Sequence, residues 1–327
     1  MSAQVKFAVI GVGLIGPRHA ATVVQNPDTQ LVAIVDPAPT SAALAAEMGA
    51  AHYTSVAALV ASADRPDAAI ICTPNHTHAA ISMELASAGV HVLVEKPISD
   101  NVAGGEALVA HLAGTGVKVL VGHHRRFNPY MIAAKEVVAS GRLGGIVAVN
   151  GLWTLYKPAP YYDAPTEWRR TQSGGVILIN MIHEVDLLHY LFGPITSVHA
   201  EKVASQRGFE AEEGAALTLR FRSGAVGSFL VADNVPSPYN FDVPDMSVWS
   251  YAPGTTKSWN AELTRDTVSV EPGVPFELQL RHFVRVIRGE EEVSCSAKAG
   301  LGALYVCQAI KEALKDNSTV QVTPYEL

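Results

Sequence analysis

A glycine-rich turn near the start of the chain constrains its fold more than any other feature. The segment Gly11–Gly16 follows the apolar run Val5–Ile10 and precedes a segment of helical composition, Arg18–Gln25. In this strand–turn–helix order, the first glycine permits a sharp turn, the second lets the backbone approach a pyrophosphate, and the third allows close helix–strand packing. The helix N-terminus then faces the phosphates. The pattern predicts a dinucleotide site that includes Gly11, Gly13, Leu14, Ile15 and Gly16.

An acidic residue supports this interpretation. Asp36 lies twenty residues beyond the last glycine, directly after the predicted strand Leu31–Val35. A carboxylate there accepts hydrogen bonds from the adenosine ribose hydroxyls and repels a 2′-phosphate. The segment Pro37–Ala46 contains no arginine or lysine to balance such a phosphate. NAD is therefore favoured over NADP, although Asp36 is alternatively only a turn residue before a proline.

A lysine follows another buried strand. Glu95-Lys96-Pro97 comes directly after the apolar run His91–Val94. Ligands of open α/β sheets bind at the carboxyl ends of the strands. The position of Lys96 therefore predicts a lysine aimed at the reactive end of a bound dinucleotide.

The remaining pattern divides the chain in two. Up to residue 122, short apolar runs alternate with alanine-rich helical segments, which predicts a doubly wound parallel sheet and a Rossmann domain over residues 1–122. The predicted strands are Val5–Ile10, Leu31–Val35, Ala68–Cys72, His91–Val94 and Val117–Val121. The predicted helices are Arg18–Gln25, Ser41–Met48, Val56–Ala61, His78–Ala88 and Ala103–Ala113.

Residues 123–327 are predicted to form an α+β domain for substrate binding and oligomerisation, with a large, open, mostly antiparallel sheet and helices on one face. The clearest hairpin joins Leu217–Arg222 to Ala225–Val231 through Ser223-Gly224. Residues 232–262 are expected to be rich in loops. The predicted helices are Asn128–Ser140, Gly175–Phe192, Phe276–Ile287 and Ala297–Lys315.

Composition excludes several classes of protein. The 327 residues carry a net charge of −7, which argues against a nucleic-acid surface. The three cysteines form no C-x-x-C pair, which favours a reducing compartment and a cytoplasmic location. No run reaches the roughly 18 apolar residues that a membrane span requires. The histidine pairs lack the spacing or the carboxylate and thiolate companions of a metal site, so no metal is expected.

The chain resembles the Gfo/Idh/MocA oxidoreductase family in three motifs that follow one another in the sequence. They are Gly11–Gly16, Cys72-Thr-Pro-Asn-His76 and Glu95-Lys96-Pro97. The resemblance covers nearly the whole length. It implies an NAD-dependent dehydrogenase that forms a homodimer or homotetramer through the exposed face of the second sheet, and a Lys96–Pro97 peptide that is often cis. The further residues that it implies around the cofactor are Thr73, Pro74, Asn75, His78, Glu95, Lys96, Arg126, Trp168 and Arg169.

The resemblance also indicates the catalytic pair. After Gly174-Gly175, His183 falls on the family histidine, whereas Ile179 stands where relatives usually have an aspartate. Acid–base work is therefore expected from His183, as the base, and from Lys96, which would stabilise alkoxide charge. Asp186, one turn beyond His183, either orients the imidazole or supports the structure.

The expected substrate is a sugar, a cyclitol or a hydroxylated ring acid. The aromatic residues of the Trp153–Trp168 loop are expected either to form one wall of the substrate pocket or, equally, to pack this loop against the sheet or a neighbouring subunit. They are Trp153, Tyr156, Tyr161 and Tyr162. Arg125 is expected to be a solvated surface charge. The expected substrate contacts are Lys96, Arg126, Tyr156, Asn180 and His183. The alternative function is a non-catalytic, NAD-binding regulatory protein of the same fold.

Overall fold

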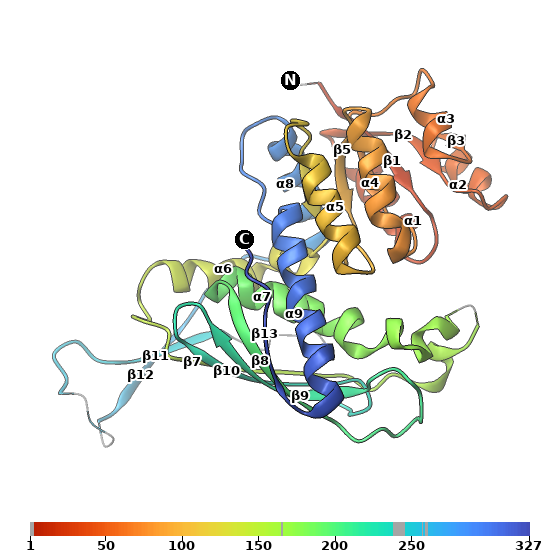
Figure 1. The fold of residues 1–327 in the computed structure, drawn as a ribbon. Coiled ribbons are helices and arrows are strands. Elements are labelled where there is room, and N and C mark those ends of the chain that lie inside the picture. The colour runs from red at the N-terminus through yellow and green to blue at the C-terminus, as the bar shows by residue number, and fades with distance from the viewer. Residues whose placement is uncertain (1–2, 165, 238–245, 257, 259–260) are drawn as a thin grey trace.

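Two sheets organise the chain in the computed structural model, which describes residues 3–164, 166–237, 246–256, 258 and 261–327 (Figure 1). The first sheet has the strand order β3-β2-β1-β4-β5-β6 and is parallel throughout. Its strands are β1 (Val5–Ile10), β2 (Thr29–Val35), β3 (Ala51–Tyr53), β4 (Ala68–Ile71), β5 (His91–Val94) and β6 (Val119–Val121). Its crossover helices are α1 (Gly16–Gln25), α2 (Ser41–Glu47), α3 (Val56–Val60), α4 (His78–Ser87) and α5 (Val102–Leu112).

The predicted Rossmann sheet is confirmed. Strands β1, β4 and β5 consist mainly of Val, Ile, Leu and Ala, and are buried along almost their whole length because helices cover both faces of a parallel sheet. The strand β3 was not predicted, because three residues are too few to show a period. Helix α1 begins at Gly16 with Pro17 in its first turn, a position that proline favours.

The second sheet has the order β13-β8-β9-β10-β7 and is antiparallel except for the parallel pair β7 and β10. Alternation on β9 and β10 buries one face and exposes the other, as predicted. In Figure 1, α7 and α9 lie over one face of this sheet. Its strands are β7 (Ala148–Thr154), β8 (Ile195–Lys202), β9 (Gly214–Phe221), β10 (Val226–Ala232) and β13 (Thr319–Gln321), and the helices are α6 (Pro129–Ala139), α7 (Ile182–Phe192), α8 (Pro275–Ile287) and α9 (Ala297–Asp316).

The segment predicted as one helix over Gly175–Phe192 differs from expectation. A π-helical turn, Ile177–Met181, precedes α7. Short 3-10 turns connect other parts of the site, at Asn75–Thr77, His124–Phe127, Ala159–Tyr162, Glu167–Arg170 and Gln172–Gly174. Such π turns are rare and occur frequently at functional sites.

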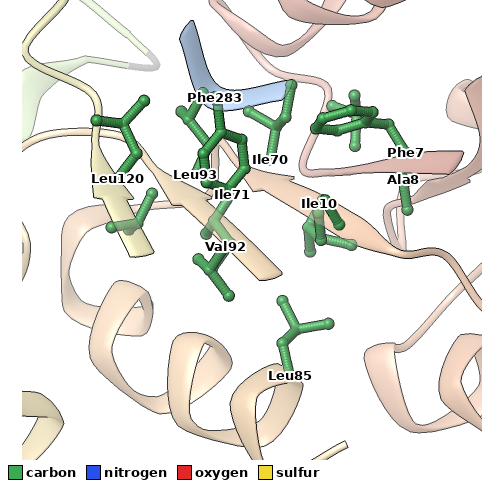
Figure 2. Packing of buried hydrophobic residues seen from close by; sticks show 14 of the residues in the cluster. Phe7, Ala8, Ile10, Ile70, Ile71, Leu85, Val92, Leu93, Leu120 and Phe283 are labelled. Atoms are coloured by element: carbon green, nitrogen blue, oxygen red, sulfur yellow. The ribbon is translucent and has the colours of Figure 1, made fainter. Parts of the chain in front are cut away.

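Helix α8 returns from late in the chain to the first sheet. Its Phe283 is fully buried and meets Phe7 of β1 edge-on, with ring centroids 6.2 Å apart. Figure 2 shows Phe283 beside Leu93 and Ile71, on the opposite side of the strands from Leu85 of α4. The first core therefore includes residues that lie far beyond position 122.

Most of the described residues of the region 232–262 lie in turns and loops, as expected. Strand β11 (Ser247–Tyr251) pairs with β12 (Leu263–Thr267) in a ribbon that extends away from the second sheet in Figure 1. Residues 238–245, 257 and 259–260 of this region lie outside the described part of the chain. Among the helices of the described residues, none is long and apolar enough to cross a membrane.

Candidate active site

The glycine-rich turn fits a dinucleotide. Gly11 has a φ of +86°, and a Cβ there would lie 2.9 Å from Thr73 Cγ2. At Gly16 a Cβ would lie 2.1 Å from the Gly11 carbonyl oxygen, so only glycine allows this close packing. In contrast, a Cβ at Gly13 meets none of the described residues within 4 Å, which leaves open space beside the backbone. The Arg18 and His19 amides donate to the Ile15 carbonyl oxygen, but no described side chain caps the N-terminus of α1, so the positive end of its dipole is left for a phosphate.

Asp36 is held beside this turn. Its Oδ2 accepts a hydrogen bond from the Val12 amide at 2.8 Å, and its Oδ1 accepts one from the Ala38 amide at 2.8 Å. Each carboxylate oxygen can accept a further hydrogen bond. The carboxylate is therefore fixed at the end of β2 and is able to receive ribose hydroxyls. Leu14, at the tip of the turn, is 83% exposed.

Glu95 and Lys96 follow β5, and the Lys96–Pro97 peptide is cis, as the resemblance implied. Glu95 is buried and pairs with His19 of α1, with 2.8 Å between Oε1 and Nε2. Burial alone would raise the pKa of Glu95, but the hydrogen bond and charge of His19, with the charge of Lys96, lower it to about 2. Glu95 is therefore an anion that ties the carboxyl end of β5 to α1.

The segment after β4 is held against the same end of the sheet. The ring nitrogens of His78 lie 2.7 Å from the Pro97 carbonyl oxygen and 2.8 Å from the Thr73 carbonyl oxygen. Thr77 Oγ1 donates to Thr73 Oγ1 at 2.6 Å. His78 thus joins the loop after β4 to the loop after β5, and fixes both around one opening.

These elements border a cavity of about 340 Å³. Nine of the expected site residues line it, from the glycine-rich turn, the loops after β4 and β5, and the second domain. They are Ile15, Thr73, Asn75, His78, Glu95, Lys96, Trp168, Arg169 and His183. The other lining residues are Cys72, Pro97, His124, Tyr161, Leu178, Ile179 and Phe276.

Lys96 crosses this cavity to the second domain. Its Nζ donates to the Ile179 carbonyl oxygen at 3.1 Å, so the backbone of the π turn anchors the lysine. Burial, together with the cationic groups of Arg125, Lys157 and Arg169, lowers the pKa of Lys96 to about 8, against the opposing effect of Glu95. Near pH 8, a substantial fraction of Lys96 is therefore a neutral amine that can accept a proton.

His183 lies among other histidines. Its ring centroid is 5.2 Å from that of His124 and 5.7 Å from that of His123. Its Nδ1 is buried and has no hydrogen-bond partner in the described residues. Burial, with the charges of Lys96 and Arg125, holds the pKa of His183 well below its usual range. The imidazole is therefore neutral and a weak base, which changes the role expected for it.

Two residues that were expected to act in the site, Arg126 and Asp186, bind each other instead. Arg126 donates from Nε and Nη2 to Asp186, at 2.8 and 2.7 Å, and from Nη1 to the Ser294 carbonyl oxygen. Arg126 is 5% exposed and does not line the cavity, so it is not part of the proposed site. Asp186 faces Arg126 rather than His183, and thus supports the structure, which was one of its two expected roles. Because Arg126 neutralises this carboxylate, the nearby group His123, Asp186 and Cys295 does not offer the free ligands that a metal requires.

Other expectations also change. The prediction that Arg125 is a solvated surface charge is wrong, because it is largely buried and forms an ion pair with Glu184. Tyr156 is 58% exposed and lies outside the cavity lining, whereas Tyr161 lines it. Asn180 is buried, and its amide oxygen accepts a hydrogen bond from Lys157 at 2.6 Å.

Several residues of the site carried no signal in the sequence. Phe276 reaches the cavity from α8, where its ring stacks on His124 with a centroid separation of 4.6 Å. Neither His124 nor Lys157 belongs to a motif that indicates a role in the site. A lone lysine before a proline in an aromatic loop gives no indication that it is buried.

Comparison with known proteins places this geometry among dehydrogenases. Residues 5–123 match the oxidoreductase family with an NAD-binding Rossmann fold, GFO/IDH/MocA, and residues 131–250 match the GFO/IDH/MocA C-terminal domain. The chain is 33% identical over 250 residues to scyllo-inositol 2-dehydrogenase (NAD(+)) of Bacillus subtilis (74% of this chain, 71% of that protein). It is 24% identical over 334 residues to inositol 2-dehydrogenase of Rhizobium meliloti (97% and 99%). The WlbA dehydrogenase from Bordetella pertussis, solved with NADH and UDP-GlcNAcA, superposes with a TM-score of 0.81 at 25% identity over 99% of each chain.

Proposed function

The chain belongs to the GFO/IDH/MocA oxidoreductase family, and we propose that it transfers a hydride between NAD and a carbinol carbon of a sugar, cyclitol or similar polyhydroxylated molecule. The observation that carries this proposal is the cavity in which Lys96 and His183 meet beside Ile15 of the glycine-rich turn. A lysine with a pKa of about 8, a neutral imidazole and a residue of the dinucleotide turn border one cavity, and this combination suits the oxidation of an alcohol.

The cofactor is bound by the first sheet. The open space at Gly13 and the uncapped N-terminus of α1 suit the pyrophosphate. Asp36 suits the adenosine ribose and disfavours a 2′-phosphate, so NAD is preferred over NADP. The nicotinamide side is bordered by groups on the loops after β4 and β5 and on the second domain: Thr73, Pro74, Asn75, His78, Glu95, Lys96, Trp168 and Arg169.

The proton of the reacting hydroxyl passes to Lys96. Bound NAD supplies the hydride acceptor in the oxidation direction. The neutral amine of Lys96, anchored on the Ile179 carbonyl oxygen at 3.1 Å, accepts the proton at Nζ. His183 offers a ring nitrogen to the same oxygen and orients it. With a pKa well below its usual range, His183 hydrogen-bonds the substrate rather than carrying the proton.

The substrate class follows from the polar lining and from the relatives. Lys96, His183 and Arg169 present donors to the cavity, while the ring of Tyr161 provides an apolar face that suits a sugar or cyclitol ring. The relatives' names refer to inositol and to a nucleotide-linked uronic acid. These features support a polyhydroxylated substrate.

The two halves have separate tasks. Residues 1–122 form the NAD-binding domain, to which α8 returns, and residues 123–327 bind substrate and mediate assembly. The open face of the second sheet exposes Leu152 and Leu230, which are neighbours in the register of β7 and β10. An exposed apolar sheet face of this kind supports a homodimer or homotetramer. The free thiols of Cys72, Cys295 and Cys307 support a reducing, cytoplasmic location.

The test is a titration of the purified protein with NAD and a panel of polyols that includes myo-inositol, scyllo-inositol, glucose and glucuronate. NADH formation is followed by absorbance. We expect turnover with at least one member of the panel and a loss of about 100-fold or more in Lys96→Met. Tight NAD binding without turnover across the panel would favour the regulatory protein instead.

A further inference from the structure

A second buried lysine also contacts the π turn Ile177–Met181. Lys157 follows β7, is 5% exposed, and donates from Nζ to the Asn180 amide oxygen at 2.6 Å. The same ammonium lies 3.1 Å from Asp233 Oδ2. Asn180 directly follows Ile179, whose carbonyl oxygen anchors Lys96. The two lysines therefore hold adjacent residues of one turn.

Lys157 is not required to neutralise Asp233. The Asp233 carboxylate also accepts hydrogen bonds from Tyr162 Oη at 3.0 Å and from Arg207 Nη1 at 2.7 Å. Removing the lysine would leave a buried acid that still has a cationic partner and a hydroxyl donor. Burying an ammonium group is itself costly, because the charge loses its hydration. Besides its contacts with the rings of Trp153 and Tyr161, Lys157 supplies the hydrogen bond to Asn180, which neither Arg207 nor Tyr162 replaces.

The turn that Lys157 holds carries groups of the reaction on both sides of Asn180. The Ile179 carbonyl oxygen precedes it, and His183 follows on the first turn of α7. A shift of about 1 Å in a group that orients a reacting atom can reduce the rate by about 100-fold. Fixing the side chain of Asn180 therefore fixes the acceptor of Lys96 and the start of the helix that carries His183.

We propose that Lys157 is a positioning residue of the reaction: through Asn180 it holds the π turn Ile177–Met181, and thereby the anchor of Lys96, in the catalytic geometry. The inference rests on the proposed function for its effect on turnover. Its effect on Lys96 itself is measurable without a substrate.

The charge of Lys157 gives a second consequence. It is one of the cations that lower the pKa of Lys96, so replacing it with a neutral residue raises that pKa, whereas arginine keeps the charge. Other groups that act electrostatically with Lys96 come from the loops, the histidine cluster and the second domain. They are Glu95, Arg125, Arg169, His78, His123, His124 and His183.

The experiment compares Lys157→Met and Lys157→Arg with the wild type and with Lys135→Met. Lys135 is a matched control, because its ammonium also donates a short hydrogen bond to an oxygen, at 2.6 Å, but that oxygen is the Tyr190 carbonyl near the end of α7 and not part of the π turn. Two quantities are measured: kcat with a substrate from the panel, and the rate at which acetic anhydride acetylates Lys96 as a function of pH, read by mass spectrometry. The second quantity reports the titration of Lys96 directly.

We expect Lys157→Met to lower kcat by about 10- to 100-fold and to move the midpoint of Lys96 acetylation to higher pH. Lys157→Arg keeps the midpoint but lowers kcat, because a planar guanidinium does not reproduce the ammonium contact to Asn180. Lys135→Met changes neither quantity. An unchanged kcat and midpoint in Lys157→Met overturns the proposal.

Two further outcomes are decisive. If Lys157→Met loses NAD binding and cooperative unfolding, Asn180→Ala replaces it; wild-type kcat in that variant overturns the positioning role. If the wild type turns over no substrate, the proposed function fails. The acetylation midpoints of Lys157→Met and Lys157→Arg then still decide whether Lys157 acts on Lys96.

Discussion

Replacing Gly13 with alanine separates cofactor binding from folding. Gly13 does not have a positive φ, and a Cβ built on it meets no atom within 4 Å. A Gly→Ala change at such a position stabilises a protein by roughly 0.4–1 kcal/mol, because it restricts the unfolded chain. We therefore expect the free energy of unfolding of the cofactor-free protein to be unchanged or slightly increased.

The same methyl group should interfere with NAD. It would occupy the open space through which the backbone approaches the pyrophosphate. Losing one hydrogen bond to a charged group costs roughly 1.5–3 kcal/mol, which raises the Kd for NAD by roughly 10- to 150-fold. Isothermal titration calorimetry with NAD measures the Kd, and urea denaturation measures stability.

Two further alanine variants serve as controls. Gly145→Ala adds a Cβ that likewise meets none of the described residues within 4 Å, but Gly145 lies between α6 and β7, in the second half of the chain. The Kd for NAD should therefore stay at the wild-type value, while the free energy of unfolding is unchanged or slightly increased, as for Gly13→Ala. Gly16→Ala places its Cβ 2.1 Å from the Gly11 carbonyl oxygen and should destabilise the protein without ligand. Wild-type affinity for NAD in Gly13→Ala would refute the assignment of the turn.

Three other predictions concern charge, cofactor choice and assembly. The pKa of Glu95 is lowered from 4.5 to about 2, so its ionised form stabilises the fold by on the order of 3 kcal/mol above pH 4.5, and this contribution is lost as the pH falls towards 2. The difference in unfolding free energy between wild type and Glu95→Gln should therefore narrow from about pH 6 to about pH 3. A difference that stays constant over this range would contradict the pairing of Glu95 with His19. Asp36→Ala should reduce the ratio of NADP Kd to NAD Kd at least about tenfold by calorimetry, because the repelling carboxylate is gone; an unchanged ratio would show that Asp36 does not select the cofactor. Leu230→Glu places a charge on the exposed face of the second sheet and should therefore lower the mass of the assembly measured by light scattering, relative to the wild type and to Val24→Glu, whose site is exposed on α1. An unchanged mass would exclude this face of the second sheet as the interface.

Local features of the sequence predicted most of the first sheet. Strand β1, the turn Gly11–Gly16 and helix α1 are consecutive, so their signals lie within one short window. The same holds for β5 and Glu95-Lys96. Ligands of open α/β sheets bind at the carboxyl ends of the strands, and this rule predicted the position of Lys96, whereas Thr73 was implied only by the family resemblance.

Contacts between distant segments were not predictable in the same way. The return of α8, which brings Phe283 to the first core and Phe276 to the cavity, depends on tertiary packing that no local period encodes. The ion pair of Arg126 with Asp186 joins residues that are sixty positions apart in the sequence. Because no local pattern indicates this pair, Arg126 was expected beside the cofactor. The low pKa of His183 follows from burial beside Lys96 and Arg125, which a residue type alone cannot indicate.

The pH dependence of kcat in the oxidation direction tests the central claim most directly. Lys96 must be neutral to accept the hydroxyl proton, so kcat of the wild type should rise with pH through an apparent pKa of about 8 and then level off. Lys96→Met should lose this limb together with about 100-fold or more of the rate. A wild-type profile that is flat across pH 8, or a Lys96→Met variant that keeps wild-type turnover, would contradict the assignment of Lys96 as the proton acceptor.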